Sequence, residues 1–310
     1  MMKTDASTTP HEHDLGLAHD LKILERQSRE RRRMLGLITG VGGSLLLPAC
    51  GGGGGESGSS TTTSAASTAS ATTSGTTTTT STSTTTTSSL SSCVADPTET
   101  AGPYPADGSN SRNGSVVNAL VSSGIVRSNI RSSFGSSSTT AAGVPVALTI
   151  SLVNTNASCA VLSGYAIYLW HCNAAGQYSL YDLPAENYLR GVQSTDDLGQ
   201  ATFLTIFPGC YAGRYPHIHF EVYRSTGTAT QGSNSLLTSQ MCLPRDACSA
   251  VYSANSSVYS GSTANLAGVT IASDNVFGDN NAAQIAAQTP TLSGSASAGY
   301  TATIVVGLAL

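Results

Sequence analysis

Alternating apolar and polar positions mark the part of the chain that folds, and the alternation has the period of a β-strand. In residues 144–152 every second position is a large aliphatic side chain, which predicts a strand with one buried face. Residues 165–172 are apolar at nearly every position, as expected of a central strand covered on both faces. Residues 201–207, which follow an Asp-Asp-Leu-Gly turn signal, and residues 217–223 and 300–308 show further strand patterns.

Helical periodicity is scarce in the same region. Residues 246–252 and 281–288 are the only helix candidates, and both are short. No internal repeat is present. Residues 93–310 are enough for one large β domain, so the pattern predicts an all-β fold, a β-sandwich with few short helices.

The N-terminal residues have the pattern of an export signal. Three arginines, residues 31–33, precede an uncharged stretch, residues 34–47, which ends at Leu-Pro-Ala-Cys50. As a helix this stretch would reach about 21 Å, short of the roughly 30 Å of a bilayer core, so it indicates a cleavable signal and not a membrane span. The arginines resemble a twin-arginine signal, with a Sec-type signal as the alternative, and the Cys50 motif resembles a lipobox.

A low-complexity segment follows the signal. Residues 51–92 are Gly, Ser, Thr or Ala except at Glu56 and Leu90, so they offer almost no apolar surface to offset the entropy of ordering. The sequence therefore predicts a signal peptide in residues 1–49, a disordered tether in residues 50–92 and a folded domain in residues 93–310. The expected location is exported, periplasmic or cell-surface, with the membrane reached only through a lipid anchor at Cys50.

Composition agrees with this division and excludes two classes of protein. Only 10% of residues are charged, half of the 14 Lys and Arg residues precede residue 34, and no aromatic residue precedes Tyr104. A domain without a basic stripe is not a nucleic-acid binder, and a chain without long apolar runs is not a polytopic membrane protein. Six cysteines follow Cys50. In an exported chain an even number predicts disulfides, whose pairing the sequence leaves open, although Cys242 and Cys248 are close enough to pair locally.

The histidines supply the first chemical signal. His217 and His219 form a His-X-His pair in a predicted strand, so both imidazoles point to one face and can reach one metal ion. A solvated strand face is the alternative interpretation of such a pair. His171, which follows Trp170 in another strand, is interpreted as a packed histidine and not as a ligand.

Several ordered motifs resemble those of one enzyme family. Residues 207–220, Phe-Pro-Gly-Cys-Tyr-Ala-Gly-Arg-Tyr-Pro-His-Ile-His-Phe, are similar to the iron-binding stretch of intradiol ring-cleavage dioxygenases, and residues 167–179 resemble the segment that gives that family its first tyrosine ligand. Further matches are Leu189-Arg190-Gly191, Thr195-Asp196, Pro97-Thr98-Glu99, Gly102-Pro103-Tyr104 and Gln240. The resemblance covers roughly residues 93–310.

The resemblance implies a non-haem Fe(III) enzyme on a β-sandwich of mixed topology. Its implied iron ligands are Tyr178, Tyr211, His217 and His219. The family pattern also places Arg214 beside the reacting ring, Gln240 at the pocket wall and Tyr104 at the substrate entrance. Phenolate is a hard anionic donor that suits Fe(III). The implied reaction cleaves a small aromatic diol with O2 between its two hydroxylated carbons, giving a cis,cis-muconate-type diacid, with Tyr211 as the general base.

The sequence departs from the cytosolic catechol and protocatechuate enzymes in two ways. Only five residues separate Tyr211 from His217, so the substrate-facing loop is short, as in the exported branch of the family. The helical dimerisation segment of the catechol enzymes has no counterpart, which leaves the oligomeric state open. Few arginines lie near the motifs, and this favours neutral or varied catechols.

Other interpretations of the site remain. Cys172 and Cys210 flank it and are expected to be disulfide partners, while Glu221 is expected to be a solvated or supporting carboxylate. The chain could be a tethered, non-catalytic β-sandwich binding module of the same fold. It could also hold Zn or Cu at the His-X-His pair, but zinc prefers His, Cys and carboxylate over paired tyrosines.

Overall fold

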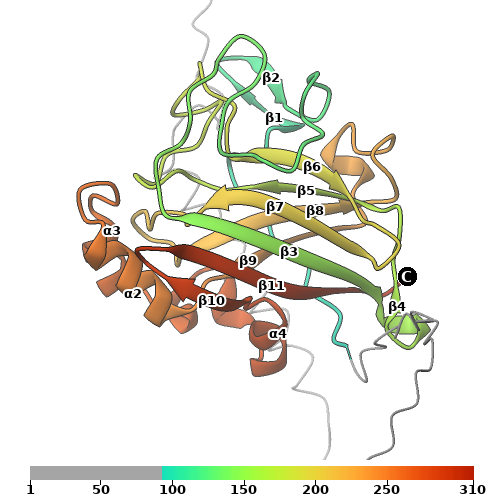
Figure 1. Ribbon diagram of the computed structural model, residues 1–310. Helices are drawn as coiled ribbons and strands as arrows, with labels where there is room; N and C mark the ends of the chain where they lie inside the picture. Colours follow the sequence, from blue (N-terminus) through green and yellow to red (C-terminus); the bar gives the residue numbers. More distant parts are fainter. Residues whose placement is uncertain (1–92) are drawn as a thin grey trace, which may run out of the picture.

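Two packed β-sheets form the core of the described part of the protein, residues 93–310 of the computed structural model, and β1 and β2 form a separate two-stranded sheet (Figure 1). One sheet has the order β10-β11-β3, with β7 and β4 both paired to β3, and the other has the order β6-β5-β8-β9. β11 runs parallel to β3, whereas the remaining pairs are antiparallel. The predicted all-β sandwich of mixed topology is therefore confirmed. The predicted signal segment, the Cys50 anchor and the tether lie outside the described residues.

The bounds of the strands match the apolar patterns where one face of the strand is buried. The predicted strands correspond to β3 (Pro145–Asn154), β5 (Ala166–Trp170), β7 (Gln200–Ile206), β8 (His217–Tyr223) and β11 (Gly299–Leu308). The sequence patterns missed six others, namely β1 (Asp107–Arg112), β2 (Ser115–Asn118), β4 (Ala160–Val161), β6 (Arg190–Ser194), β9 (Leu237–Cys242) and β10 (Thr291–Ser295).

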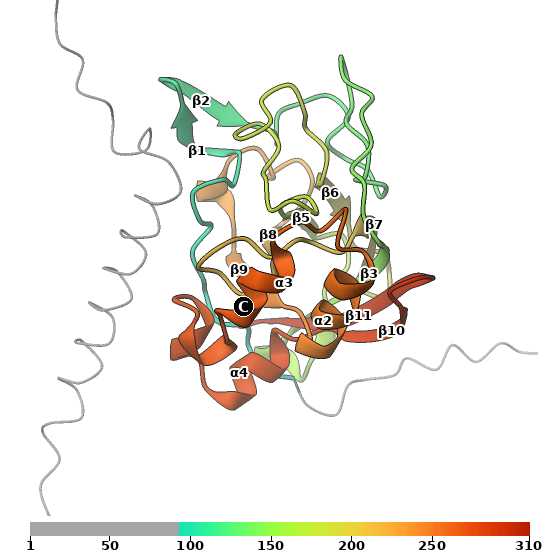
Figure 2. The same ribbon diagram turned by 90° about the vertical axis from the view of Figure 1, so that its left-hand side faces the viewer.

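Both predicted helices are present. They are α2 (Arg245–Ala254) and α4 (Ala282–Ala287), and Asn281 caps α4 by accepting hydrogen bonds from the backbone N–H groups of residues 283 and 284. A third helix, α3 (Ser262–Ala267), was not predicted. The three helices lie on one side of the sandwich, away from the β1–β2 hairpin (Figure 2). Short 3-10 helices cover Thr155–Ala157, Gly232–Asn234, Ile271–Ser273 and Phe277–Asp279.

The alternation along β5 and β8 divides their side chains between two cores. Ile218, Phe220 and Val222 of β8 point into the core between the two sheets. Trp170 of β5 and Tyr223 of β8 belong to a second cluster on the outer face of the four-stranded sheet. The N-terminal residues of the domain and the loops after β2 and β5 cover that face, which is why every residue of β5 and β8 is buried. No helix within residues 93–310 is long and apolar enough to cross a bilayer.

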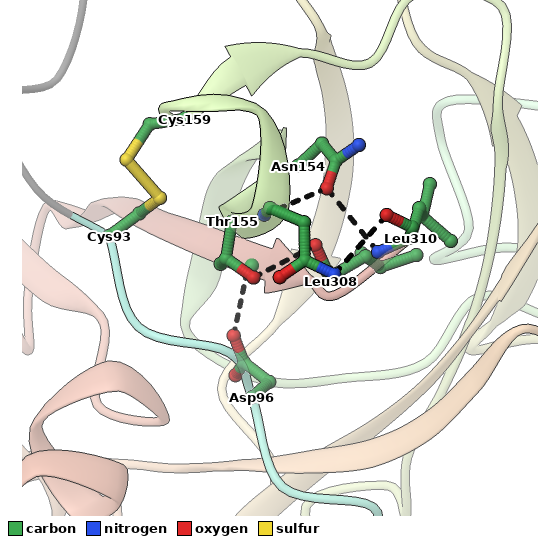
Figure 3. The surroundings of a disulfide bond; sticks show 9 residues. Cys93, Asp96, Asn154, Thr155, Cys159, Leu308 and Leu310 are labelled. Atoms are coloured by element: carbon green, nitrogen blue, oxygen red, sulfur yellow. Dashed lines mark hydrogen bonds between the residues drawn. A yellow bond between two sulfur atoms is a disulfide. The ribbon is translucent and has the colours of Figure 1, made fainter.

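One disulfide, Cys93–Cys159, ties the start of the domain to the turn after β3 (Figure 3). The expected disulfide roles of the other cysteines are wrong, because Cys172, Cys210, Cys242 and Cys248 are buried free thiols. Cys242 and Cys248 do not pair because each thiol lies against a different partner. The Cys242 Sγ is 3.1 Å from the Thr289 hydroxyl oxygen, and the Cys248 Sγ, within α2, is 3.9 Å from the carbonyl oxygen of Leu243, which precedes the helix.

Asp96, close to this disulfide, is a buried carboxyl group that pairs with β11. Its backbone N–H donates to the Gly307 carbonyl oxygen at 2.9 Å, and its Oδ2 accepts the Gly307 N–H at 2.8 Å. Its Oδ1 has no hydrogen-bond partner among the described residues. Burial raises the pKa of Asp96 to about 7, because the charged form loses its hydration.

Replacing Asp96 by asparagine is expected to stabilise the domain increasingly as the pH rises from 5 to 8. The folded pKa lies above the unfolded value, so the contribution of the neutral acid is fully present below pH 4 and is lost as pH rises through 7. The advantage of the amide reaches at most about 4 kcal/mol at pH 8. Urea unfolding at both pH values measures it, with exposed Asp279→Asn as the control. If the variant and the wild type differed in unfolding free energy by the same amount at pH 5 and pH 8, the raised pKa of Asp96 would be contradicted.

Candidate metal centre

The site lies on the outer face of the four-stranded sheet, where three segments meet. β8 presents His217 and His219 on that face, since alternate residues of a strand share a side. The loop between β7 and β8 carries Tyr211, and the loop between β5 and β6 carries Tyr178. Gly176 backs onto Tyr211 so closely that a Cβ there would lie 2.9 Å from the tyrosine Cβ. This position, with φ +81°, requires glycine.

The polar ends of the four side chains converge on one point. The Tyr178 Oη lies 3.5 Å from the Tyr211 Oη, 3.4 Å from the His217 Nε2 and 3.3 Å from the His219 Nε2. The His217 Nε2 lies 3.1 Å from both the Tyr211 Oη and the His219 Nε2. Nitrogen and oxygen donors have this spacing when each lies about 2 Å from one shared metal ion.

The tautomer of His217 strengthens this interpretation. Its Nδ1 lies 2.6 Å from the Tyr215 carbonyl oxygen, which can only accept, so Nδ1 carries the proton and Nε2 presents a bare lone pair. That lone pair faces the Nε2 of His219. The two Nε2 atoms are 3.1 Å apart, so either a proton on His219 or a cation must lie between them. The donor set therefore fits a metal ion.

Trp170 holds the second histidine in place. Its ring stacks on His219 with centroids 4.9 Å apart and an interplanar angle of 6°. The His219 Nδ1 is buried without a hydrogen-bond partner among the described residues, so stacking replaces the hydrogen bond that usually orients a ligating imidazole. Gly102 closes the opposite side, where a Cβ would lie 3.2 Å from the His219 ring.

Burial keeps all four groups neutral in the metal-free protein. It lowers the pKa of His217 to about 3, with a further contribution from the Arg214 charge, and it lowers the pKa of His219 well below its usual value. Burial also raises the pKa of Tyr211 to about 12 and that of Tyr178 well above its usual value. The imidazoles are thus ready to bind a metal, whereas the phenols need a strongly charged cation to ionise.

Within residues 93–310 no three or more His, Cys, Asp and Glu side chains gather in a way that could hold a metal ion. The zinc and copper hypothesis therefore rests on His217 and His219 alone. A centre at this place needs the two tyrosines, and phenolate oxygen suits a hard trivalent cation better than zinc.

Arg214 and Gln240, both predicted site residues, hydrogen-bond to each other beside the histidines. The Arg214 Nη2 donates to the Gln240 Oε1 at 2.6 Å, and Gln240 lies opposite His219 in the β8–β9 pairing. The Arg214 Nε also forms an ion pair with Asp274 at 3.0 Å, with both side chains buried. Asp274 was not predicted, because it lies in a short segment without strand or helix periodicity.

Tyr104, predicted to lie at a substrate entrance, packs against two other tyrosines near the convergence point. Its ring centroid is 5.1 Å from that of Tyr178 and 4.9 Å from that of Tyr181. The Tyr104 side chain is half-buried, and its role at an entrance stays a prediction. Tyr181, which completes this row of rings, was not predicted, because only its contacts distinguish it from other loop tyrosines.

Two other predicted residues lie away from the convergence point. His171 bonds with Nε2 to the Thr205 hydroxyl at 2.7 Å and with Nδ1 to the Cys172 carbonyl at 2.7 Å, so its interpretation as a packed histidine is confirmed. The interpretation of Glu221 as solvated is wrong. It is buried and accepts a hydrogen bond from the Tyr223 hydroxyl at 2.5 Å.

Solved structures place this fold among known proteins. No family model and no curated protein sequence matches the chain. An intradiol ring-cleavage dioxygenase from Tetranychus urticae is similar, with 22% identity over 70% of this chain and 95% of that chain and a TM-score of 0.51. The dioxygenase domain of a carbohydrate-binding fusion from Streptomyces sp. SirexAA-E has 20% identity over 69% and 98%, with a TM-score of 0.42. A catechol 1,2-dioxygenase from Pseudomonas arvilla C-1 has 17% identity over 61% and 58%, with a TM-score of 0.38.

The first of these comparisons shows the fold. Residues 93–310 have the architecture of the intradiol ring-cleavage dioxygenases, as the sequence motifs predicted. The roles of the site residues and the exported branch of the family stay predictions.

Proposed function

We propose that this protein is an exported, non-haem Fe(III) dioxygenase that cleaves catechol-type rings between their two hydroxylated carbons. The observation that carries the proposal is the convergence of two phenol oxygens and two imidazole nitrogens at 3.1–3.5 Å. In the reaction the bond between the two hydroxylated carbons breaks, and both atoms of O2 enter a cis,cis-muconate-type diacid. A non-catalytic binding module would not need this donor set.

Tyr178, Tyr211, His217 and His219 would hold the iron. When bound there, the iron would supply the Lewis-acid and redox chemistry that lets a diol ring react with O2. Two tyrosinates offset two of the three positive charges of the ion, and the two neutral histidines add donors without charge.

The protein side chains have separate tasks in this proposal. Tyr211 is half-buried, whereas Tyr178 is 2% exposed, so Tyr211 is the tyrosine that incoming substrate can reach. Its phenolate oxygen would accept a proton from the diol. Arg214 would stabilise negative charge that develops on the ring. The aromatic row of Tyr104 and Tyr181 would exclude water from the entrance.

The export part of the proposal rests on the N-terminal pattern and on one bond. Cys93–Cys159 is a disulfide in the described domain, and disulfides persist in oxidising compartments. A periplasmic or cell-surface location, with Cys50 as a lipid anchor, agrees with it. Membrane fractionation of a Cys50→Ser variant tests the anchor, since the variant should become soluble.

Titration of the metal-free protein with Fe(III) is expected to quench its fluorescence and to produce a visible colour. Trp170 is the only tryptophan of the chain, and its ring stacks on His219, so an ion at the site lies within quenching distance. Tyrosinate-to-Fe(III) charge transfer should add a broad absorption band at the same stoichiometry. Oxygen uptake with catechol then tests the reaction.

Zn(II) in place of Fe(III) is the control, because it lacks a charge-transfer band. Quenching without the visible band under Fe(III) would mean that the histidines bind metal and the tyrosines do not. A colourless protein after iron reconstitution would refute the proposed function.

A further inference from the structure

Arg214 is fixed by two partners that leave one part of its guanidinium for substrate. Its Nε donates to Asp274 and its Nη2 donates to Gln240. Its Nη1 has no partner among the residues that the structure describes, although the side chain as a whole is 2% exposed. The Arg214 side chain is therefore held so that Nη1 is the group that can reach a bound ring.

The Asp274 carboxylate is itself fixed in place, so it cannot shift together with the Arg214 side chain. Its Oδ2 also accepts the Tyr215 N–H at 2.7 Å, and its Oδ1 accepts the N–H groups of Val276 and Phe277 at 2.9 and 3.1 Å. The residue is fully buried between two 3-10 turns. Four N–H donors thus hold the carboxylate, and the Arg214 charge lowers the pKa of Asp274, so it stays ionised beside the guanidinium.

Each of the remaining cations of the domain donates to partners other than Asp274 and Gln240. All five N–H donors of Arg190 are used within the protein, on Tyr104, Pro105, Tyr168 and Ser179. Arg127 and Arg245 donate to backbone carbonyls. Arg131 and Arg224 bond to Asn129 and Tyr165. Arg112 donates its Nε to the Tyr181 carbonyl. The domain has no lysine.

We propose that Asp274 is a positioning and specificity-determining residue that orients Arg214 and offsets part of its charge, so that the site selects catechols without a ring carboxylate. This inference rests on the proposed function and deepens it. A substrate carboxylate at Arg214 would share a cation that already has a carboxylate at 3.0 Å, and it would repel Asp274. An uncharged diol has no carboxylate for Asp274 to repel, and it contacts only the Nη1 donor of Arg214.

The first test compares two diols of similar size on the wild-type, iron-loaded protein. The kcat/KM for 4-methylcatechol should exceed that for 3,4-dihydroxybenzoate by about tenfold or more, the effect of one unfavourable charge contact in a buried site. Anaerobic binding of each diol, read from the visible band or Trp170 fluorescence, should show the same order. Equal values, or a preference for the acid, would overturn the proposal.

The second test is Asp274→Asn, which removes the charge and keeps the size. The variant should lower kcat for 4-methylcatechol, because Arg214 loses its orientation, while the preference for it over the acid shrinks about tenfold. A structural defect alone would lower both substrates together and keep their ratio. That result would overturn the proposal. Asp279→Asn, an exposed aspartate five residues away, is the matched control and should change neither value.

Three further outcomes are distinguishable. If Asp274→Asn does not fold, the wild-type comparison still decides. If no diol supports oxygen uptake, the proposed function fails, and the two binding constants still test selection by charge. If Arg112→Met removes the preference for 4-methylcatechol over 3,4-dihydroxybenzoate, or changes the kcat/KM for the acid, then Arg112 and not Asp274 sets the specificity. That result would overturn the proposal.

Discussion

Replacing His219 by alanine is expected to remove the visible band and the oxygen uptake together. His219 supplies one of the four convergent donors, and its Nε2 lies 3.1 Å from that of His217 and 3.3 Å from the Tyr178 oxygen. Loss of groups that merely support a ligand costs 10–100-fold in metal affinity, so loss of the ligand itself should cost more than about 100-fold. Tyr178→Phe should have the same effect on colour and activity. Iron content after reconstitution, the absorption spectrum and oxygen uptake with catechol measure it.

Matched controls separate this effect from general destabilisation. His171→Asn removes another buried histidine, which bonds to Thr205 and lies outside the convergence point. Tyr223→Phe removes a tyrosine hydroxyl four residues after His219 in β8. Both variants should keep stoichiometric iron and its colour. If the His219 or Tyr178 variant retained colour and turnover, the four convergent residues would not be the metal ligands.

The local parts of this site were predictable from sequence. The alternation of residues within β8 is enough to place His217 and His219 on one face. This prediction therefore needs no contact with a distant part of the chain. The strands whose inner face enters the core, such as β3 and β7, carry the same signal. β10 was missed for the opposite reason. It is a polar edge strand, Thr-Leu-Ser-Gly-Ser, with no buried residue and therefore no apolar alternation.

The long-range parts of the site were not predictable. Asp274 meets Arg214 across 60 positions of the chain, and nothing in its own neighbourhood marks it as a buried ion-pair partner. The cysteines show the same limit. The even number of cysteines and the short spacing between Cys242 and Cys248 suggested that these two pair. The observed bond instead joins Cys93 to Cys159 over 66 positions. Such contacts depend on how the two sheets pack, and the periodicity of the residues carries no information about that packing.

The first residues of the domain connect this disulfide to the candidate metal centre. Beyond Cys93 the chain runs along β9, where the Pro97 carbonyl accepts the Ser239 hydroxyl at 2.7 Å and the Glu99 N–H donates to the Thr238 carbonyl at 2.8 Å. The Thr100 carbonyl then accepts the Gln240 side chain at 2.8 Å. Two residues further on, Gly102 lies against the ring of His219. The segment that covers the metal centre is thus held by its own hydrogen bonds along its length and by the disulfide only at its start.

Removing the disulfide with the double change Cys93→Ser and Cys159→Ser is therefore expected to cost stability without dismantling the metal centre. A cross-link that closes a 66-residue loop stabilises a domain by about 4 kcal/mol through the entropy of the unfolded chain. For a domain of this size the melting temperature should fall by about 8–16 °C. The visible band of the iron-loaded protein at 20 °C should stay, because Pro97, Glu99 and Thr100 keep their partners on β9. Dithiothreitol should lower the melting temperature of the wild type by a similar amount and leave the double variant unchanged. A band lost at 20 °C in a folded double variant would show instead that the disulfide holds the covering segment over His219.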